Sequence, residues 1–162
     1  MALVKKSDGR FNNPILPAFG IVSALSAEDR ELLSSYGQFF PVQAGEHFIL
    51  EGDEQDSLYY VISGMLLVYV DRGGEAIKVG RVGAGESLGE VNLFDPAQAS
   101  ANVVAQDFSQ VWRCNRADLE SFLSTYHEAG CRLMIGMMTN MSQRLRQMNE
   151  TFHGDPDPTP TA

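Results

Sequence analysis

A series of short apolar segments separated by turn signals constrains the fold more than any other feature of the sequence. The segments are four to seven residues long, and turns such as residues 51–56, 63–64 and 71–74 divide them. Many short strands at a spacing of about 8–12 residues are typical of an antiparallel sandwich or barrel. The sequence therefore predicts a mainly β domain with strands over residues 47–50, 58–62, 65–70, 76–82, 101–105 and 109–114.

Helices are expected on both sides of these strands. Ser26 can cap a helix whose first turn carries Glu28 and Asp29, and Gly37 can end that helix in a left-handed turn. After the last strand, Asn115 can cap a second helix that starts at residue 116. The predicted domain thus has flanking helices at both ends of its strand region.

A long helix is expected over residues 128–150. Its apolar residues are spaced 4, 3, 4 and 3 apart, as in a coiled-coil seam, at Met134, Met138, Met141, Leu145 and Met148. Isolated soluble domains rarely expose such a stripe. We therefore expect a homodimer through this helix, and packing of the stripe against the chain's own strands is the alternative.

The two ends of the chain differ in composition from its middle. Residues 1–19, which include Pro14 and Pro17, are expected to form an arm, and residues 154–162 a disordered proline-rich tail. Between them we expect a β domain over residues 20–126 and a long C-terminal helix over residues 127–153.

Charge and hydropathy argue against several classes of partner. The formal net charge is −9 at pH 7, whereas proteins that bind nucleic acid usually carry a basic face. No apolar run approaches the roughly 18 residues that a membrane helix needs, and the first residues have no secretory-type apolar core. We expect a cytoplasmic protein that contacts neither DNA directly nor a membrane.

The sequence does not predict catalytic chemistry. No nucleophile–base pair, paired catalytic acids or metal-ligand spacing is apparent, so we do not expect an enzyme. His47, His127 and His153 are scattered, and we interpret them as surface or structural residues. Cys114 and Cys131 are expected to be two reduced, mostly buried thiols.

The most unusual stretch is glycine-rich and covers residues 83–101. A short helix that begins near Gly89 would leave free backbone N–H groups at its start, and such a terminus favours an anion. Glu90 beside it would offer a carboxylate to a hydroxyl group. This arrangement suits a sugar phosphate, but no Lys or Arg occurs between residues 82 and 111 to supply a cation.

The sequence resembles the cyclic-nucleotide-binding domain of the catabolite-activator and kinase-regulatory-subunit superfamily over residues 20–150. Three motifs carry the resemblance, namely residues 44–53, residues 56–64 and the phosphate cassette over residues 85–105. The resemblance implies an antiparallel jelly-roll β-barrel with flanking helices, which include an N-terminal helix and a long C-terminal helix that dimerises.

The resemblance also assigns roles within the cassette. In the family a Gly-Glu pair is followed by eight residues and then by Arg, a small residue and Ala. This chain keeps the spacing, so Glu90 matches the acceptor of the ribose 2′-hydroxyl, Ser100 matches a donor to the cyclic phosphate, and Ala99 replaces the phosphate-binding arginine. The cassette positions assigned to the ligand are Gly89, Glu90, Val91, Ala99, Ser100 and Ala101.

The missing arginine is expected to weaken ligand binding. A hydrogen bond to a charged group contributes about 1.5–3 kcal/mol, and its loss costs about 10- to 150-fold in affinity. Arg144 is our candidate for a replacement cation, because the long helix covers the pocket in family members; a solvated helix arginine is the alternative. The adenine-contacting pair of the family falls on Met148 and Asn149, which weakens a prediction of cAMP specificity.

Two functions remain open from the sequence. The first is a non-enzymatic signal-transduction module that senses a cyclic nucleotide or a related small anion, with weak binding of cAMP or cGMP. The second is a ligand-free adaptor of the same fold that contacts a protein effector. DNA-binding relatives continue into a helix-turn-helix domain after the long helix, and we expect none here because only about a dozen residues follow.

Overall fold

The strands form two four-stranded antiparallel sheets. The computed structural model describes residues 14–95 and 97–153. The first sheet has the order β1-β10-β4-β7, and its strands span Gln38–Val42, Ser109–Asn115, Ser57–Ser63 and Ser87–Leu88. The second has the order β2-β9-β5-β6, with strands over His47–Ile49, Asn102–Ala105, Met65–Arg72 and Glu75–Gly83. A small third sheet pairs β3 (Glu54–Gln55) with β8 (Ala97–Gln98).

The predicted fold class is confirmed, but the strands do not close into a barrel. Among the described strands, β1 and β7 are the edges of the first sheet, and β2 and β6 are the edges of the second. The strands β2 and β7 have three and two residues, which is too short to join the two sheets by a continuous ladder. The sheets instead pack face to face as a sandwich.

Side chains of both sheets meet in the inter-sheet core. Because successive side chains of a strand point to opposite faces, Tyr59 and Val61 of β4 enter this core, while Leu58 and Tyr60 point away from it. The inter-sheet core consists of Val42, Ile49, Tyr59, Val61, Leu66, Val82, Leu88, Ala99, Val103, Ala105 and Val111. Burial on both faces explains why β4 is a continuous apolar run in the sequence.

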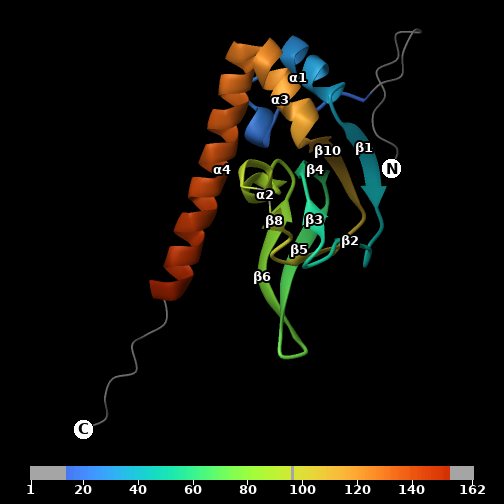
Figure 1. Ribbon diagram of the computed structural model, residues 1–162, viewed down its shortest axis with the longest axis vertical. Coiled ribbons are helices and arrows are strands. Elements are labelled where there is room, and N and C mark those ends of the chain that lie inside the picture. The colour runs from blue at the N-terminus through green and yellow to red at the C-terminus, as the bar shows by residue number, and fades with distance from the viewer. Residues whose placement is uncertain (1–13, 96, 154–162) are drawn as a thin grey trace.

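The outer face of the first sheet is covered by helices, which form the helix-side core. These are η1 (Gly20–Val22), α1 (Ala27–Ser34), α3 (Arg116–Thr125) and α4 (His127–His153). Leu58, Tyr60 and Trp112 from the sheet pack with Leu33 of α1 and Phe122 of α3. Figure 1 shows α1 and α3 near the start of α4, which then runs along the side of the sheets.

The predicted helix starts are confirmed by their capping bonds. The Ser26 side chain accepts a hydrogen bond from the Asp29 amide, and the Asn115 side chain accepts one from the Asp118 amide. The predicted role of Gly37 is wrong, because Gly37 is not in the left-handed region. A side chain at Gly37 would collide with the Trp112 ring, so close packing is what restricts this position to glycine.

The β5–β6 hairpin turns as predicted. Gly73 and Gly74 both have positive φ, of 64° and 84°, and the Gly74 amide donates to the Asp71 side chain at 3.1 Å. Two positive φ values in a row are typical of a tight hairpin turn, which glycine makes at no steric cost. The hairpin protrudes at the end of the molecule opposite α1 and α3 (Figure 1).

The expected ends of the chain lie largely outside the described residues. Of the predicted arm over residues 1–19, the structure describes residues 14–19, and the predicted tail over residues 154–162 lies entirely outside. Within the described ranges, no helix combines the length and hydropathy that crossing a bilayer requires.

Candidate functional site

Glycines bring the start of the cassette close to β4. Gly85 and Gly89 have φ values of 88° and 91°, a region that other residues rarely adopt. A side chain at Gly89 would collide with the Ser57 carbonyl oxygen of β4. The chain then enters α2 (Glu90–Phe94), which confirms the short helix predicted near Gly89. Figure 1 places α2 between α4 and the sheets.

Glu90 is buried and both of its carboxylate oxygens have partners. Only 3% of the residue is exposed. The Ser87 hydroxyl donates a hydrogen bond to Oε1 of Glu90, and Nη1 of Arg144 lies 3.9 Å from Oε2. A buried carboxylate needs such partners, because removing the charge from water is costly. The acceptor that the resemblance assigns to the ribose is thus engaged within the chain.

Arg144 extends from α4 to the cassette. Its Nη2 donates to the Ser87 carbonyl oxygen, and its Nε lies 3.8 Å from Oε2 of Glu86. The side chain is 28% exposed. Arg144 is thus half-buried and contacts the cassette, and its role as a replacement cation for a ligand stays a prediction.

Residues 99–101, the small residues after α2, do not join the cluster around Glu90. Ala99 is buried in the inter-sheet core. Its amide donates to the Asp53 carbonyl oxygen at 2.7 Å, and its own carbonyl oxygen accepts from the Gly52 amide at 2.8 Å. Ser100 is exposed, and Ala101 is half-buried. Within the described residues, no hydrogen bond or ion pair joins positions 99–101 to Glu90 or to Arg144.

The structure thus brings together only part of the predicted site. Glu90 and Arg144 meet at the start of α2, whereas Met148 and Asn149 are exposed on α4. The backbone of Val91 lies in α2, and its side chain is not among the described ones. The ligand-binding role of each of these residues stays a prediction.

Sequence reasoning missed Glu86 and Ser87 as members of the site. Ser87 precedes α2 and donates from its hydroxyl to the side chain of Glu90, the first residue of that helix, and no pattern in the sequence indicated this contact. Glu86 gave no signal either. Its carboxylate accepts from the Gly83 amide at 3.1 Å through Oε1 and faces Arg144 through Oε2.

The resulting cluster is rich in acceptors. Two carboxyl groups and one carbonyl oxygen share the single guanidinium of Arg144. A phosphate that entered this cluster would have to share that guanidinium with Glu86 and Glu90. The acceptors of this cluster therefore compete for one donor.

Comparison with protein families supports the resemblance. A family model described as a cyclic nucleotide-binding domain matches residues 39–126, which is more than half of the chain. The cAMP-dependent protein kinase regulatory subunit of Blastocladiella emersonii is 39% identical over 83 residues, which are 51% of this chain and 21% of that protein. The cyclic AMP receptor protein of Thermus thermophilus is 30% identical over 95 residues, which are 58% of this chain and 44% of that protein. The chain thus spans less than half the length of either relative.

The fold has a close counterpart among solved structures. A cyclic nucleotide-binding domain from Methylobacillus flagellatus superposes with a TM-score of 0.76, and the match covers 84% of this chain and 77% of that domain. Their sequences are 23% identical. At that identity the likeness shows that the two chains share a fold.

Proposed function

Because the chain belongs to the cyclic nucleotide-binding domain family, we propose that it is a non-enzymatic signal-transduction module whose cassette senses a small ligand and acts on α4 through Arg144. The ligand we propose is a cyclic nucleotide, cAMP or cGMP, or a related anion that carries a hydroxyl group. The observation that carries the proposal is the contact of Arg144 with Glu86, Ser87 and Glu90, which ties the helix to the cassette.

The chemistry of sensing follows from the partners of Glu90. A ribose 2′-hydroxyl that donates to Glu90 would compete with the Ser87 hydroxyl and with Arg144 for the two carboxylate oxygens. The cyclic phosphate would attract the Arg144 guanidinium away from Glu86 and Glu90, because both are acceptors for the same donor. Either event changes the contacts that position α4. Ligand binding in the cassette would therefore change the position or mobility of α4 without any chemical reaction.

Weak affinity is part of this proposal. Ala99 removes a charge-assisted bond that contributes about 1.5–3 kcal/mol, or about 10- to 150-fold in affinity. Arg144 compensates incompletely, because the acceptors already around it must give up part of their interaction. The names of the relatives, a kinase regulatory subunit and a receptor protein, support a regulatory role.

A ligand-free adaptor is the second candidate, and one observation favours it. The partners of Glu90 are complete without a ligand, since Ser87 and Arg144 contact both carboxylate oxygens. In an adaptor, Arg144 would fix α4 permanently against the cassette, and the exposed side of α4 would contact a protein effector. The two candidates differ in whether a nucleotide can displace these contacts.

Isothermal titration of cAMP and cGMP separates the two candidates. We expect the native chain to bind one of them weakly but saturably, and Arg144→Gln to weaken binding about tenfold, because the remaining cation is lost. The matched control is Arg132→Gln, which removes an exposed α4 arginine that pairs with Glu128 at 2.7 Å and should leave binding unchanged.

Two results would contradict the sensing proposal. No heat of binding from either nucleotide at millimolar concentration would favour the adaptor. Tighter binding by Arg144→Gln than by the native chain would show that Arg144 blocks the cassette and does not serve it.

A further inference from the structure

A pocket lies beside β1, outside the cassette and α4. It has a volume of about 520 Å³. Its lining residues belong to the strands β1, β2, β4 and β10, and Pro14 from the N-terminal segment completes the lining. We call it the β1 pocket, and its lining residues are Pro14, Gln38, Phe39, Phe40, Phe48, Tyr59 and Arg113. We propose that the β1 pocket binds a small organic monoanion that joins a flat apolar ring system to one carboxylate.

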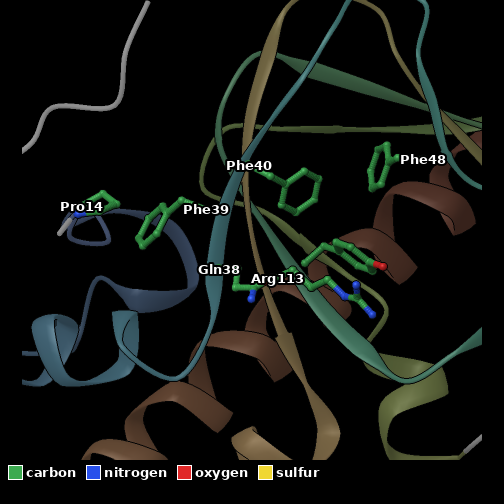
Figure 2. A pocket seen from close by; sticks show the side chains of 7 residues that line it. Pro14, Gln38, Phe39, Phe40, Phe48 and Arg113 are labelled. Carbon is green, nitrogen blue, oxygen red and sulfur yellow. The ribbon is translucent and has the colours of Figure 1, made fainter.

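Three aromatic rings form the apolar wall of this pocket. Phe40, Phe48 and Tyr59 pack edge to face, with ring centroids 6.2 Å, 6.4 Å and 5.6 Å apart in their three pairings. Phe40 and Phe48 are half-buried, so part of their surface remains available for contact. Figure 2 shows Phe40 and Phe48 on the same side of β1 as Arg113, and Pro14 and Phe39 on the other. A flat ring placed against this wall would bury apolar area and make further edge or face contacts.

Arg113 supplies the positive end of the pocket. Its Nε donates to the Ser57 hydroxyl at 2.9 Å, its Nη2 lies 3.6 Å from Oδ1 of Asp56, and its guanidinium carbon lies 5.9 Å from the centroid of the Tyr59 ring. These contacts fix the direction of the guanidinium, which is the arrangement that planar recognition of a carboxylate requires. The Asp56 side chain is 70% exposed, so its pairing with Arg113 is screened by water and displaceable at low cost.

The charges around Arg113 favour a ligand with one negative charge over a ligand with two. A single guanidinium faces the pocket, and Asp56 stands beside it. The second charge of a phosphate dianion would have no cation among the lining residues and would lie near the Asp56 carboxylate. Burial raises the pKa of Tyr59 and outweighs the lowering by Arg113, so the hydroxyl stays neutral and does not repel an anion. A monocarboxylate fits these conditions better than a phosphate.

The size of the pocket agrees with a ligand of this kind. Small-molecule sites are commonly about 300–1,000 Å³, mostly apolar, with a few polar groups that fix orientation. The β1 pocket combines the cluster of Phe40, Phe48 and Tyr59 with the Arg113 guanidinium, and the Gln38 amide is a second polar group. This inference does not rest on the proposed function, because none of the lining residues belongs to the cassette.

The test uses 2-naphthoate as the probe and neutral 2-naphthamide as its uncharged match, each titrated into the 162-residue chain and followed by calorimetry. We expect saturable binding of 2-naphthoate and about tenfold weaker binding of 2-naphthamide, because a half-exposed arginine contributes less than a buried one. Arg113→Gln should weaken 2-naphthoate binding about tenfold and abolish the preference over the amide.

Matched variants identify the site. Arg116→Gln removes an exposed arginine that pairs with Glu120 at 2.9 Å on the neighbouring helix, and it should leave binding unchanged. Phe48→Leu keeps an apolar side chain but removes one ring, and it should weaken both probes several-fold. Thermal melting of each variant establishes that it folds.

Three results would overturn the inference. The first is no saturable binding of 2-naphthoate by the native chain. The second is equal binding of the acid and the amide. The third is loss of binding in Arg144→Gln but not in Arg113→Gln, which would place the anion in the cassette.

Discussion

At position 99 the backbone is held firmly while the side chain contributes only a methyl group. The amide and the carbonyl oxygen of Ala99 bond to Asp53 and Gly52, and the methyl group packs in the inter-sheet core. This position can therefore present a longer side chain from a fixed start. By the resemblance, position 99 is where family members carry the phosphate-binding arginine, and the loss of that cation here stays a prediction.

Ala99→Arg should restore part of the affinity for cyclic nucleotides. Arginine can make two charge-assisted bonds to one phosphate, and the expected gain is about 10- to 150-fold. Overpacking of the inter-sheet core works against this gain, at a cost of about 1–3 kcal/mol. Isothermal titration of the native chain and the variant measures the change, and Ala99→Gln serves as the uncharged control.

A folded Ala99→Arg variant that binds no nucleotide would contradict this prediction. It would show that the cassette is closed by other contacts, of which the Arg144–Glu90 pairing is the first to remove.

The two cysteines differ, which corrects the prediction that both are buried. Cys114 is buried in the helix-side core, where its thiol contacts the Tyr36 carbonyl oxygen at 3.4 Å, whereas Cys131 is exposed on α4. Periodicity alone did not separate them, because Cys131 lies two residues before the buried Leu133 on the outer side of the helix.

Only Cys131 should react with a thiol reagent in the folded protein. Burial raises the pKa of Cys114 from 9.0 to about 12, so its thiol stays neutral and unreactive. We expect one fast thiol per chain at pH 8 with Ellman's reagent and two after unfolding, and Cys131→Ser should abolish the fast reaction. The raised pKa contributes stability that is present below pH 9 and is lost as the pH rises towards 12. Two equally fast thiols in the native state would contradict the assignment.

The helix α4 has two faces that serve different purposes. One face packs against the body of the molecule through Ala129, Leu133, Met137 and Asn140, which are spaced 4, 4 and 3 apart. Gly136 lies against η1 so closely that a side chain would collide with the Ile21 carbonyl oxygen. The other face exposes large apolar residues, namely Ile135, Met138, Leu145 and Met148.

The predicted seam on α4 needs one correction. Met134 packs against the helix-side core of its own chain and is not available to a partner. The reason is that the first half of α4 lies on η1 and α3, so residues near Met134 face the body, whereas Met138 and Leu145 are 61% and 60% exposed. The rest of the seam stays a prediction.

Replacement of Met138 and Leu145 by glutamate should convert a dimer into a monomer. Charges in the middle of an apolar helix contact are costly to bury, and two chains would place them close together. Multi-angle light scattering measures the mass, and the control is Gln143→Glu combined with Gln147→Glu, which adds the same charge elsewhere on α4. A native chain that elutes as a monomer, or a double variant with unchanged dimer mass, would rule out this interface.

The sequence was sufficient to predict those helices and strands whose pattern extends over several residues. Short apolar segments predicted β4, β5, β6, β9 and β10, and the caps at Ser26 and Asn115 predicted where α1 and α3 begin. The strands β3, β7 and β8 have two residues each, which is too short for a period of two to be recognised. Their ladders depend on segments brought together by the rest of the fold.

Across the whole molecule, the site combines a local part with a distant part. The spacing from Gly89 to Ala101 is local, so the sequence alone could assign predicted roles to Glu90 and Ala99. The contact of Arg144 with Glu86 and Ser87 depends on how α4 packs on η1 and α3, which no local pattern specifies. The β1 pocket likewise draws residues from four strands and left no motif in the sequence.

The proposed signalling role requires that ligand binding in the cassette changes α4. Arg144 is the side chain that links them, and its contacts with Glu90 and Glu86, at 3.9 Å and 3.8 Å, are those that a nucleotide would disturb. A change in these contacts should alter how often the backbone of α4 opens to solvent.

Amide hydrogen exchange with and without millimolar cAMP measures this link most directly. We predict that cAMP changes the exchange rates of residues 86–94 and of α4 around Arg144, while peptides from α1 and α3 serve as unaffected references. With cAMP raised about tenfold to restore the same occupancy, Arg144→Gln should keep the response of residues 86–94 and lose that of α4. Protection confined to the cassette in the native chain, with α4 exchanging at the same rate with and without cAMP, would contradict the account.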